Sequence, residues 1–163
     1  MNKRILVYGL ISGFIIIGTS ILSLRLDVAS AWLGFLVMFL VFSSIFVSVK
    51  QYRDNVLGGV IRFNTGFLLG LGTTFVASLV YVLVWEAYLA LSDYSFIEIY
   101  TQSIVEAARA RGASIAELAA TMEEMENMRK SYASPLIRLP MTFVEIFPVG
   151  FLLSLIAGFV LKR

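Results

Sequence analysis

The sequence has no cysteine and no histidine among its 163 residues. Without cysteine the chain can form no disulfide and offers no thiol nucleophile or thiolate metal ligand. Without histidine it lacks the commonest metal ligand and the commonest general base. Both absences count against a catalytic or metal centre. We therefore expect a protein that is not an enzyme and that holds no cofactor.

Charged residues are also scarce. They make up 15% of the chain, whereas soluble domains carry about 25%. The formal net charge of +2 is small and scattered along the chain, so nothing indicates nucleic-acid binding. No linker rich in proline or serine divides residues 1–163, and the length suits a single domain.

Long apolar runs take the place of the missing charges. A membrane-spanning helix needs roughly 20 predominantly apolar residues, and four runs reach that length. These runs are Ile5–Leu24, Val28–Val49, Thr65–Trp85 and Leu139–Leu161. Glu145 is the one charged residue inside them. The sequence therefore predicts an all-α polytopic membrane protein with four transmembrane helices.

The distribution of basic residues predicts the orientation of these spans. Four spans place both termini and the loop of residues 50–64 on one side, which carries seven basic residues and one acid, Asp54. The other side carries six basic residues and eight acids. Because Lys and Arg near span ends are retained in the cytoplasm, we expect both termini there and residues 87–138 outside.

A cleaved signal peptide is the alternative at the start of the chain. Ala29-Ser30-Ala31 has the small-x-small pattern of a cleavage site. The preceding apolar run is longer than the usual signal core of about 7–15 residues, and Arg25 and Asp27 interrupt the approach to the site. An uncleaved first span is the better interpretation.

Residues 95–133, between the third and fourth spans, predict two amphipathic helices. One face of Phe96–Arg111 carries Ile97, Tyr100, Ile104 and Ala108, and Gly112 ends this helix. Ser114 and Glu117 form a capping-box pattern at the start of the next helix. One face of that helix carries Leu118, Met122, Met125, Met128 and Tyr132. We expect an extracytoplasmic amphipathic hairpin held by packing of these faces, with partner binding as the alternative, because methionine suits adaptable contacts.

Small residues recur at intervals of four within the spans. Gly9 and Gly13 form one pair, and Gly66 and Gly70 form another. Such pairs allow helix backbones to approach closely inside a membrane. They serve either the packing of the four spans or the association of the chain as a homo-oligomer or with another membrane protein.

Glu145 is the candidate intramembrane polar site. A carboxylate that faces lipid is costly, so it should face the bundle or become neutral. Its candidate partners are Glu86 at the outer end of the third span, Arg138 two helical turns earlier, and the hydroxyls of Tyr81 and Ser78. We interpret the site as a structural polar lock. The alternative is an ion or proton site in a small transporter or channel.

The loop between the second and third spans carries Lys50, Arg53 and Arg62. A cation at the cytoplasmic leaflet gains about 1 kcal/mol from anionic headgroups. Membrane lipids are therefore the expected partners of this loop.

Two stretches carry a resemblance to a known family. One is Lys50-Gln51-Tyr52-Arg53-Asp54 followed by Gly58-Gly59-Val60-Ile61-Arg62-Phe63; the other is Ser134-Pro135 followed by Glu145-Ile146-Phe147-Pro148-Val149-Gly150. Over nearly its whole length the chain resembles the bacterial membrane family called domain of unknown function 4199. The resemblance implies a four-span protein of the bacterial inner membrane and brings no established activity. We expect a non-enzymatic structural or interaction component, with a transporter using Glu145 as the alternative.

Overall fold

The computed structural model describes residues 1–26, 28 and 30–163. The described residues contain no strand, and their α-helices are α1 (Asn2–Arg25), α2 (Ala31–Phe42), α3 (Ser44–Val56), α4 (Phe63–Leu91), α5 (Ser95–Ala110), α6 (Ile115–Ala133) and α7 (Pro135–Leu161). The all-α class is thereby confirmed. Asp27 and Ala29, used in the charge count and in the cleavage-site alternative, lie outside the described residues.

Four helical segments are long and apolar enough to cross a membrane. They are Lys3–Arg25, Ala31–Val56, Phe63–Leu91 and Pro135–Leu161. The second segment contains both α2 and α3, which are separated at Ser43. The Ser43 hydroxyl donates a 2.7 Å hydrogen bond to the Phe39 carbonyl oxygen, a local bond that competes with the helical ladder and often bends a helix.

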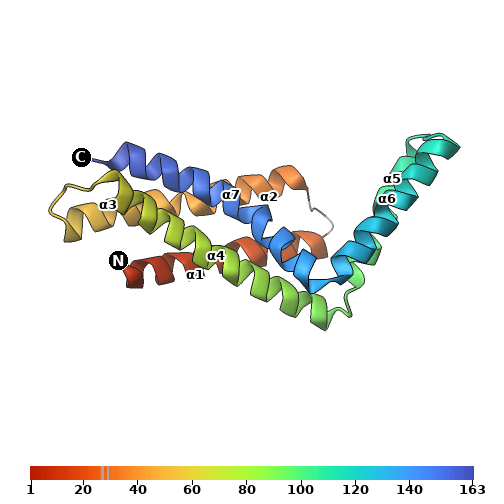
Figure 1. Ribbon diagram of the computed structural model, residues 1–163, viewed down its shortest axis with the longest axis horizontal. Helices are drawn as coiled ribbons and strands as arrows, with labels where there is room; N and C mark the ends of the chain where they lie inside the picture. Colours follow the sequence, from red (N-terminus) through yellow and green to blue (C-terminus); the bar gives the residue numbers. More distant parts are fainter. Residues whose placement is uncertain (27, 29) are drawn as a thin grey trace. The chain divides into compact units, whose positions relative to one another are not determined.

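The chain divides into two compact units. The first contains Met1–Val84 with Thr142–Arg163, and the second contains Trp85–Met141 (Figure 1). Helices α4 and α7 run through both units. The single-domain organisation stays a prediction.

In the first unit, α4 and α7 approach closely along a row of small residues. A methyl group on Gly70 would lie 2.9 Å from Ser154 Cβ, and one on Gly66 would lie 3.3 Å from the Gly158 Cα. Further along, the position of a Gly150 methyl group is already occupied by the Thr74 side chain. The helices therefore meet backbone to backbone, as small-residue spacing of four allows.

The other glycine pair brings α1 against α4. A methyl group on Gly9 would lie 2.6 Å from Val76 Cβ, and one on Gly13 would lie 2.7 Å from Val80 Cβ. Both predicted glycine pairs are thus used inside the chain, so they no longer motivate association between copies.

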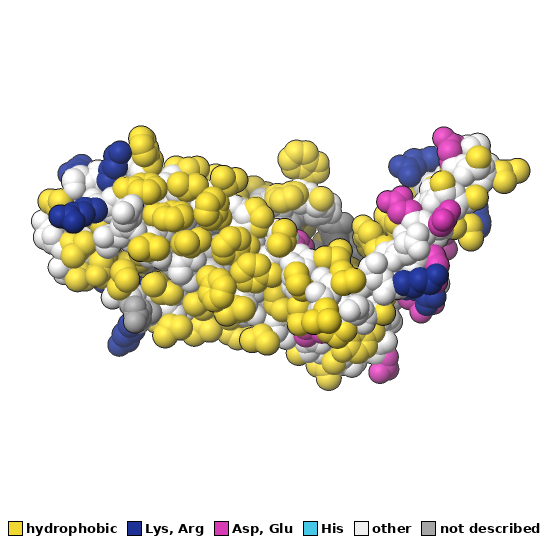
Figure 2. All heavy atoms as spheres, in the orientation of Figure 1, with side chains coloured by type: hydrophobic (Ala, Val, Ile, Leu, Met, Phe, Trp, Pro, Cys, Tyr) yellow, Lys and Arg dark blue, Asp and Glu magenta, His cyan; other side chains and the backbone are white. Residues whose placement is uncertain are grey.

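The first unit gathers basic residues at one end. Figure 1 shows both termini at the same end of this unit as the loop between α3 and α4. The backbone N–H of Arg163 donates to the Ile61 carbonyl at 3.1 Å, and Arg4 Nη1 donates to Gln51 Oε1 at 3.0 Å. Figure 2 shows Lys and Arg side chains at this end. The two termini and this loop share one end of the unit, as four spans require.

The second unit contains α5 and α6, which pack against each other. Gly112, between them, has a φ of 76°, the left-handed conformation expected at the end of α5. The Ser114–Glu117 capping box is present, with the Ser114 backbone N–H donating to Glu117 Oε2 at 2.7 Å. Both the glycine stop and the capping box agree with the sequence prediction.

The predicted apolar faces of α5 and α6 are right in part. Ala108 and Met125 are buried, but Thr101 is also buried and takes the place predicted for Tyr100, which is exposed. Met122, predicted to pack, is 54% exposed. The apolar pattern does not predict the burial of Thr101, because threonine is polar. Its hydroxyl donates to the carbonyls of Ile97 and Glu98, so the polar group is hydrogen-bonded although it is buried between the helices.

Candidate functional site

Glu145 lies on α7 with an exposed side chain. The hydroxyl of Tyr81, a buried residue of α4, donates to Glu145 Oε1 at 3.3 Å. This contact agrees with the proposal of Tyr81 as a partner. Ser78, the alternative partner, is buried, and its hydroxyl has no hydrogen-bond partner within the described residues.

Glu86 and Arg138 form a buried ion pair in the second unit. Arg138 Nε and Nη2 donate to Glu86 Oε1 and Oε2, each at 2.7 Å. The side chain of Arg138 is 4% exposed and that of Glu86 is 23% exposed. Two parallel charge-assisted bonds of this length are the strong form of a guanidinium–carboxylate contact. The pair joins the last turns of α4 to the first turn of α7.

Tyr132, near the end of α6, completes this cluster. Arg138 Nη1 donates to the Tyr132 carbonyl oxygen at 2.9 Å. The indole Nε1 of Trp85 donates to the Tyr132 hydroxyl at 2.7 Å. Each nitrogen of the Arg138 guanidinium therefore has an acceptor, and α4, α6 and α7 are held together by one side chain. We call Trp85, Glu86, Tyr132 and Arg138 the arginine clamp.

Aromatic rings lie around the guanidinium of Arg138. The Arg138 guanidinium carbon lies 5.0 Å from the Tyr94 ring centroid and 5.7 Å from that of Tyr132. The Phe96 ring meets the Trp85 ring edge to face at 4.9 Å. Tyr94 has a φ of 55°, a conformation that is uncommon outside glycine and asparagine. The backbone N–H of Tyr94 donates to the Leu89 carbonyl oxygen at 2.8 Å, which closes the turn after α4.

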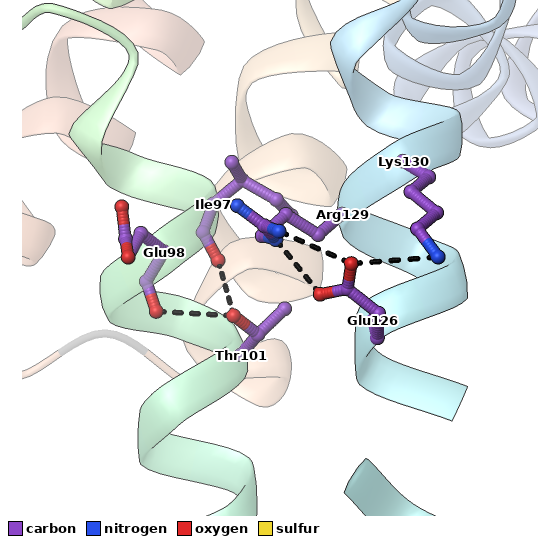
Figure 3. Close-up of polar contacts among 6 residues, drawn as sticks. All are labelled: Ile97, Glu98, Thr101, Glu126, Arg129 and Lys130. Carbon is purple, nitrogen blue, oxygen red and sulfur yellow. Dashed lines mark hydrogen bonds and ion pairs between the residues drawn. The ribbon is translucent and has the colours of Figure 1, made fainter. Parts of the chain in front are cut away.

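A second polar group lies where α5 faces α6. In Figure 3, Arg129 and Lys130 converge on Glu126, with Arg129 Nε at 2.9 Å and Lys130 Nζ at 3.5 Å from its oxygens. The hydrogen bond from Arg129 lowers the pKa of the Glu126 carboxyl. Glu98 on α5 also favours the charged form of Arg129. The two ion pairs lie within α6, between residues three and four positions apart, so they stabilise that helix.

The loop predicted to face lipid headgroups has two exposed cations and one buried cation, and its contact with lipid stays a prediction. Lys50 and Arg62 are exposed. Arg53 is only 8% exposed: its Nε pairs with Asp54 Oδ1 at 2.7 Å and its Nη1 donates to the Leu161 carbonyl at 3.4 Å. The prediction for Arg53 is therefore wrong, because the end of α7 offers an unpaired carbonyl that a guanidinium can satisfy.

Several structural partners were missed from the sequence. The pattern places Tyr132 in an apolar stripe and gives no contact for Gln51. It predicts Arg138 as a partner of Glu145, whereas the Arg138 guanidinium binds Glu86. The sequence signal for the Arg138–Glu86 pair is that Glu86 ends the third span and Arg138 begins the fourth, so the two charges are expected at the same side of the membrane.

The described residues contain no group of three or more Asp, Glu, His or Cys side chains that could hold a metal ion. The polar clusters described above consist of ion pairs, hydrogen bonds and aromatic contacts, which position the helices.

No curated protein and no solved structure was found that matches the chain. The family model described as "Protein of unknown function (DUF4199)" matches residues 6–163. The chain thus belongs to the DUF4199 family.

Proposed function

We propose that this chain is a non-enzymatic interaction component of the bacterial inner membrane. In this proposal α5 and α6 form an extracytoplasmic hairpin, and both termini are cytoplasmic. The hairpin presents a surface to a second copy of the chain or to another membrane protein.

One observation carries the proposal: α6, although it packs against α5, leaves apolar side chains exposed. Ile115 is 89% exposed and Met122 is 54% exposed, and Ala119 between them is also exposed. Their spacing of four and three residues places them on one side of α6. We call these three residues the α6 flank. These neighbouring apolar side chains offer a surface that contact with another protein would remove from water.

The arginine clamp supports this role. Within the second unit, Arg138 joins the Tyr132 end of α6 to Glu86 of α4, and a surface that is ordered before binding loses less freedom when it binds. Glu86 is engaged with Arg138, and Glu145 with Tyr81. Since an ion path normally uses several polar groups together, we favour the interaction role over transport through Glu145.

Cysteine crosslinking in the membrane tests the proposal. The chain has no cysteine of its own, so one engineered thiol reports one position. With Met122→Cys, a reagent that joins a maleimide to a photoreactive benzophenone should bond to the engineered thiol and, on illumination, insert into a C–H bond of the neighbour, giving a dimer or a discrete adduct with one other membrane protein. Asn127→Cys is the matched control, because Asn127 is exposed on α6 but lies away from the α6 flank.

Loss of the Met122→Cys adduct on introducing Ile115→Lys would support the α6 flank as the contact. A monomer that yields no adduct at position 122, or equal adducts at positions 122 and 127, would overturn the proposal.

A further inference from the structure

A groove of about 410 Å³ opens in the first unit between the start of α1 and the end of α3. Its lining includes Lys3, Arg4, Val7, Tyr8, Tyr52 and Val56. Met1 also lines it, and the walls are almost entirely apolar, so Lys3 and Arg4 contribute mainly the aliphatic parts of their side chains. An apolar groove that has cations and no acidic residue in its lining is suited to an amphipathic anion.

The charge of Arg4 is held in place by a neutral group. Gln51 Oε1 accepts from Arg4 Nη1 at 3.0 Å and from the Tyr8 hydroxyl at 3.1 Å. In the part of the chain that the structure describes, no carboxylate lies within ion-pair distance of Lys3 or Arg4. Asp54, the one acid at this end, is paired with Arg53. The groove therefore keeps two uncompensated positive charges.

The walls of the groove belong to candidate membrane-spanning segments. Val7 is 45% exposed and Val56 is 54% exposed, so both offer apolar surface to an acyl chain. Tyr8 and Tyr52 have the amphipathic rings that favour the headgroup level of a bilayer. Basic pockets between membrane helices are suited to phosphate headgroups.

We propose that this groove binds an anionic phospholipid, with its phosphate on Lys3 and Arg4 and its acyl chain against Val7 and Val56. A soluble phosphate shares the headgroup chemistry but would leave the apolar walls unused, so the experiment must separate the two sources.

Native mass spectrometry of the full chain in mild detergent, titrated with dioleoyl phosphatidylglycerol, tests the proposal. Each cation at the membrane surface contributes about a fivefold change in affinity. We expect Lys3→Gln/Arg4→Gln to weaken binding of the tightest lipid by about 25-fold. Lys50→Gln/Arg62→Gln removes the same charge from exposed positions outside the groove, and should weaken it no more than about twofold.

Two further arms identify the ligand. Val56→Gln leaves the charge unchanged and should weaken binding several-fold, whereas dioleoyl phosphatidylcholine and glycerol phosphate should bind far more weakly than phosphatidylglycerol. Equal loss in the two double variants would overturn the proposal in favour of diffuse attraction. Equal binding of glycerol phosphate would overturn it in favour of a soluble phosphate. Circular dichroism of each variant confirms that the helices persist.

Discussion

At the scale of single residues, Arg138 and Glu145 show how position on one helix decides a side chain's role. Both lie on α7, seven residues apart. Arg138 is buried and bound through two short bonds to Glu86, whereas Glu145 is exposed and accepts a longer bond from Tyr81. The strong contact is the one at the start of the helix. A substitution there should cost more than one at Glu145.

Glu145→Gln should leave the protein as stable as the wild type, or more stable. Glutamine keeps an oxygen that accepts from the Tyr81 hydroxyl, and it removes a carboxylate that is costly beside lipid. Thermal unfolding in mild detergent, at several pH values, measures the change. Tyr81→Phe is the companion variant, because it removes the donor and leaves the carboxyl. Loss of several degrees in Glu145→Gln would mean that a charged Glu145 supports the fold.

Arg138→Met should destabilise the protein by about 3 kcal/mol. It leaves Glu86 largely buried without its partner, and breaking a buried pair costs about 3–5 kcal/mol. Because Glu86 keeps some contact with solvent, we take the lower end of that range. The double variant Glu86→Leu/Arg138→Met should recover most of the loss in an equilibrium unfolding titration. If the single variant loses less than about 0.5 kcal/mol, the arginine clamp does not hold the helices.

At the scale of helices, the glycines of α4 and α7 set how closely the spans approach. Gly70→Ala and Gly150→Ala should each destabilise by about 1–3 kcal/mol, because the added methyl groups meet Ser154 and Thr74. Gly34→Ala is the matched control. Nothing lies within 4 Å of its added methyl group, so it should be neutral or stabilise helix α2 by about 0.5–1 kcal/mol. Thermal unfolding checks the prediction: Gly70→Ala and Gly150→Ala should lower the melting temperature and Gly34→Ala should not, and equal effects would contradict it.

The first turn of α6 should loosen in acid. The Ser114 backbone N–H, and secondarily its hydroxyl, lower the pKa of the Glu117 carboxyl below the ordinary 4.5. A carboxyl whose pKa is lower in the folded state stabilises the fold above its unfolded pKa, and that contribution is lost as pH falls through the folded value. Hydrogen exchange, corrected for intrinsic rates, should show faster opening of the α6 start below about pH 4.5.

Glu117→Gln separates this effect from general acid unfolding. Glutamine still accepts from the Ser114 backbone but does not titrate, so the α6 start should lose most of its pH dependence. Glu123→Gln, another exposed acid on α6, should leave that dependence intact. The reverse pattern would show that the capping box does not control this turn.

The elements were more predictable than their contacts. Apolar length predicted four spans, and Gly112 and Ser114 marked helix ends, because each of these signals acts within a few residues. Helix α4 nevertheless runs to Leu91, beyond the predicted end at Trp85, since hydropathy falls before the helix stops. The pairing of Arg138 with Glu86 and the inward position of Arg53 depend on which helices meet. A single sequence does not contain that information.

At the scale of the whole molecule, the basic end bears on membrane orientation. Direct contacts hold both chain ends near the α3–α4 region: Arg4 with Gln51, and Arg163 with Ile61. These contacts bring the basic residues of both chain ends close to those of the loop between α3 and α4, at one end of the first unit. Because such charge is retained in the cytoplasm, we predict that this end faces the cytoplasm and α6 faces outward.

Single-cysteine labelling in intact bacterial spheroplasts measures this orientation. Asn127→Cys on α6 should react with a membrane-impermeant maleimide from outside, whereas Asn55→Cys near the end of α3 should react only after permeabilisation. Both asparagines are exposed, so access to the reagent, and not burial in the protein, decides the result. The unaltered chain is the blank, because it has no thiol. The reverse labelling pattern would place the basic end outside, and labelling of both sites from outside would contradict the four-span arrangement itself.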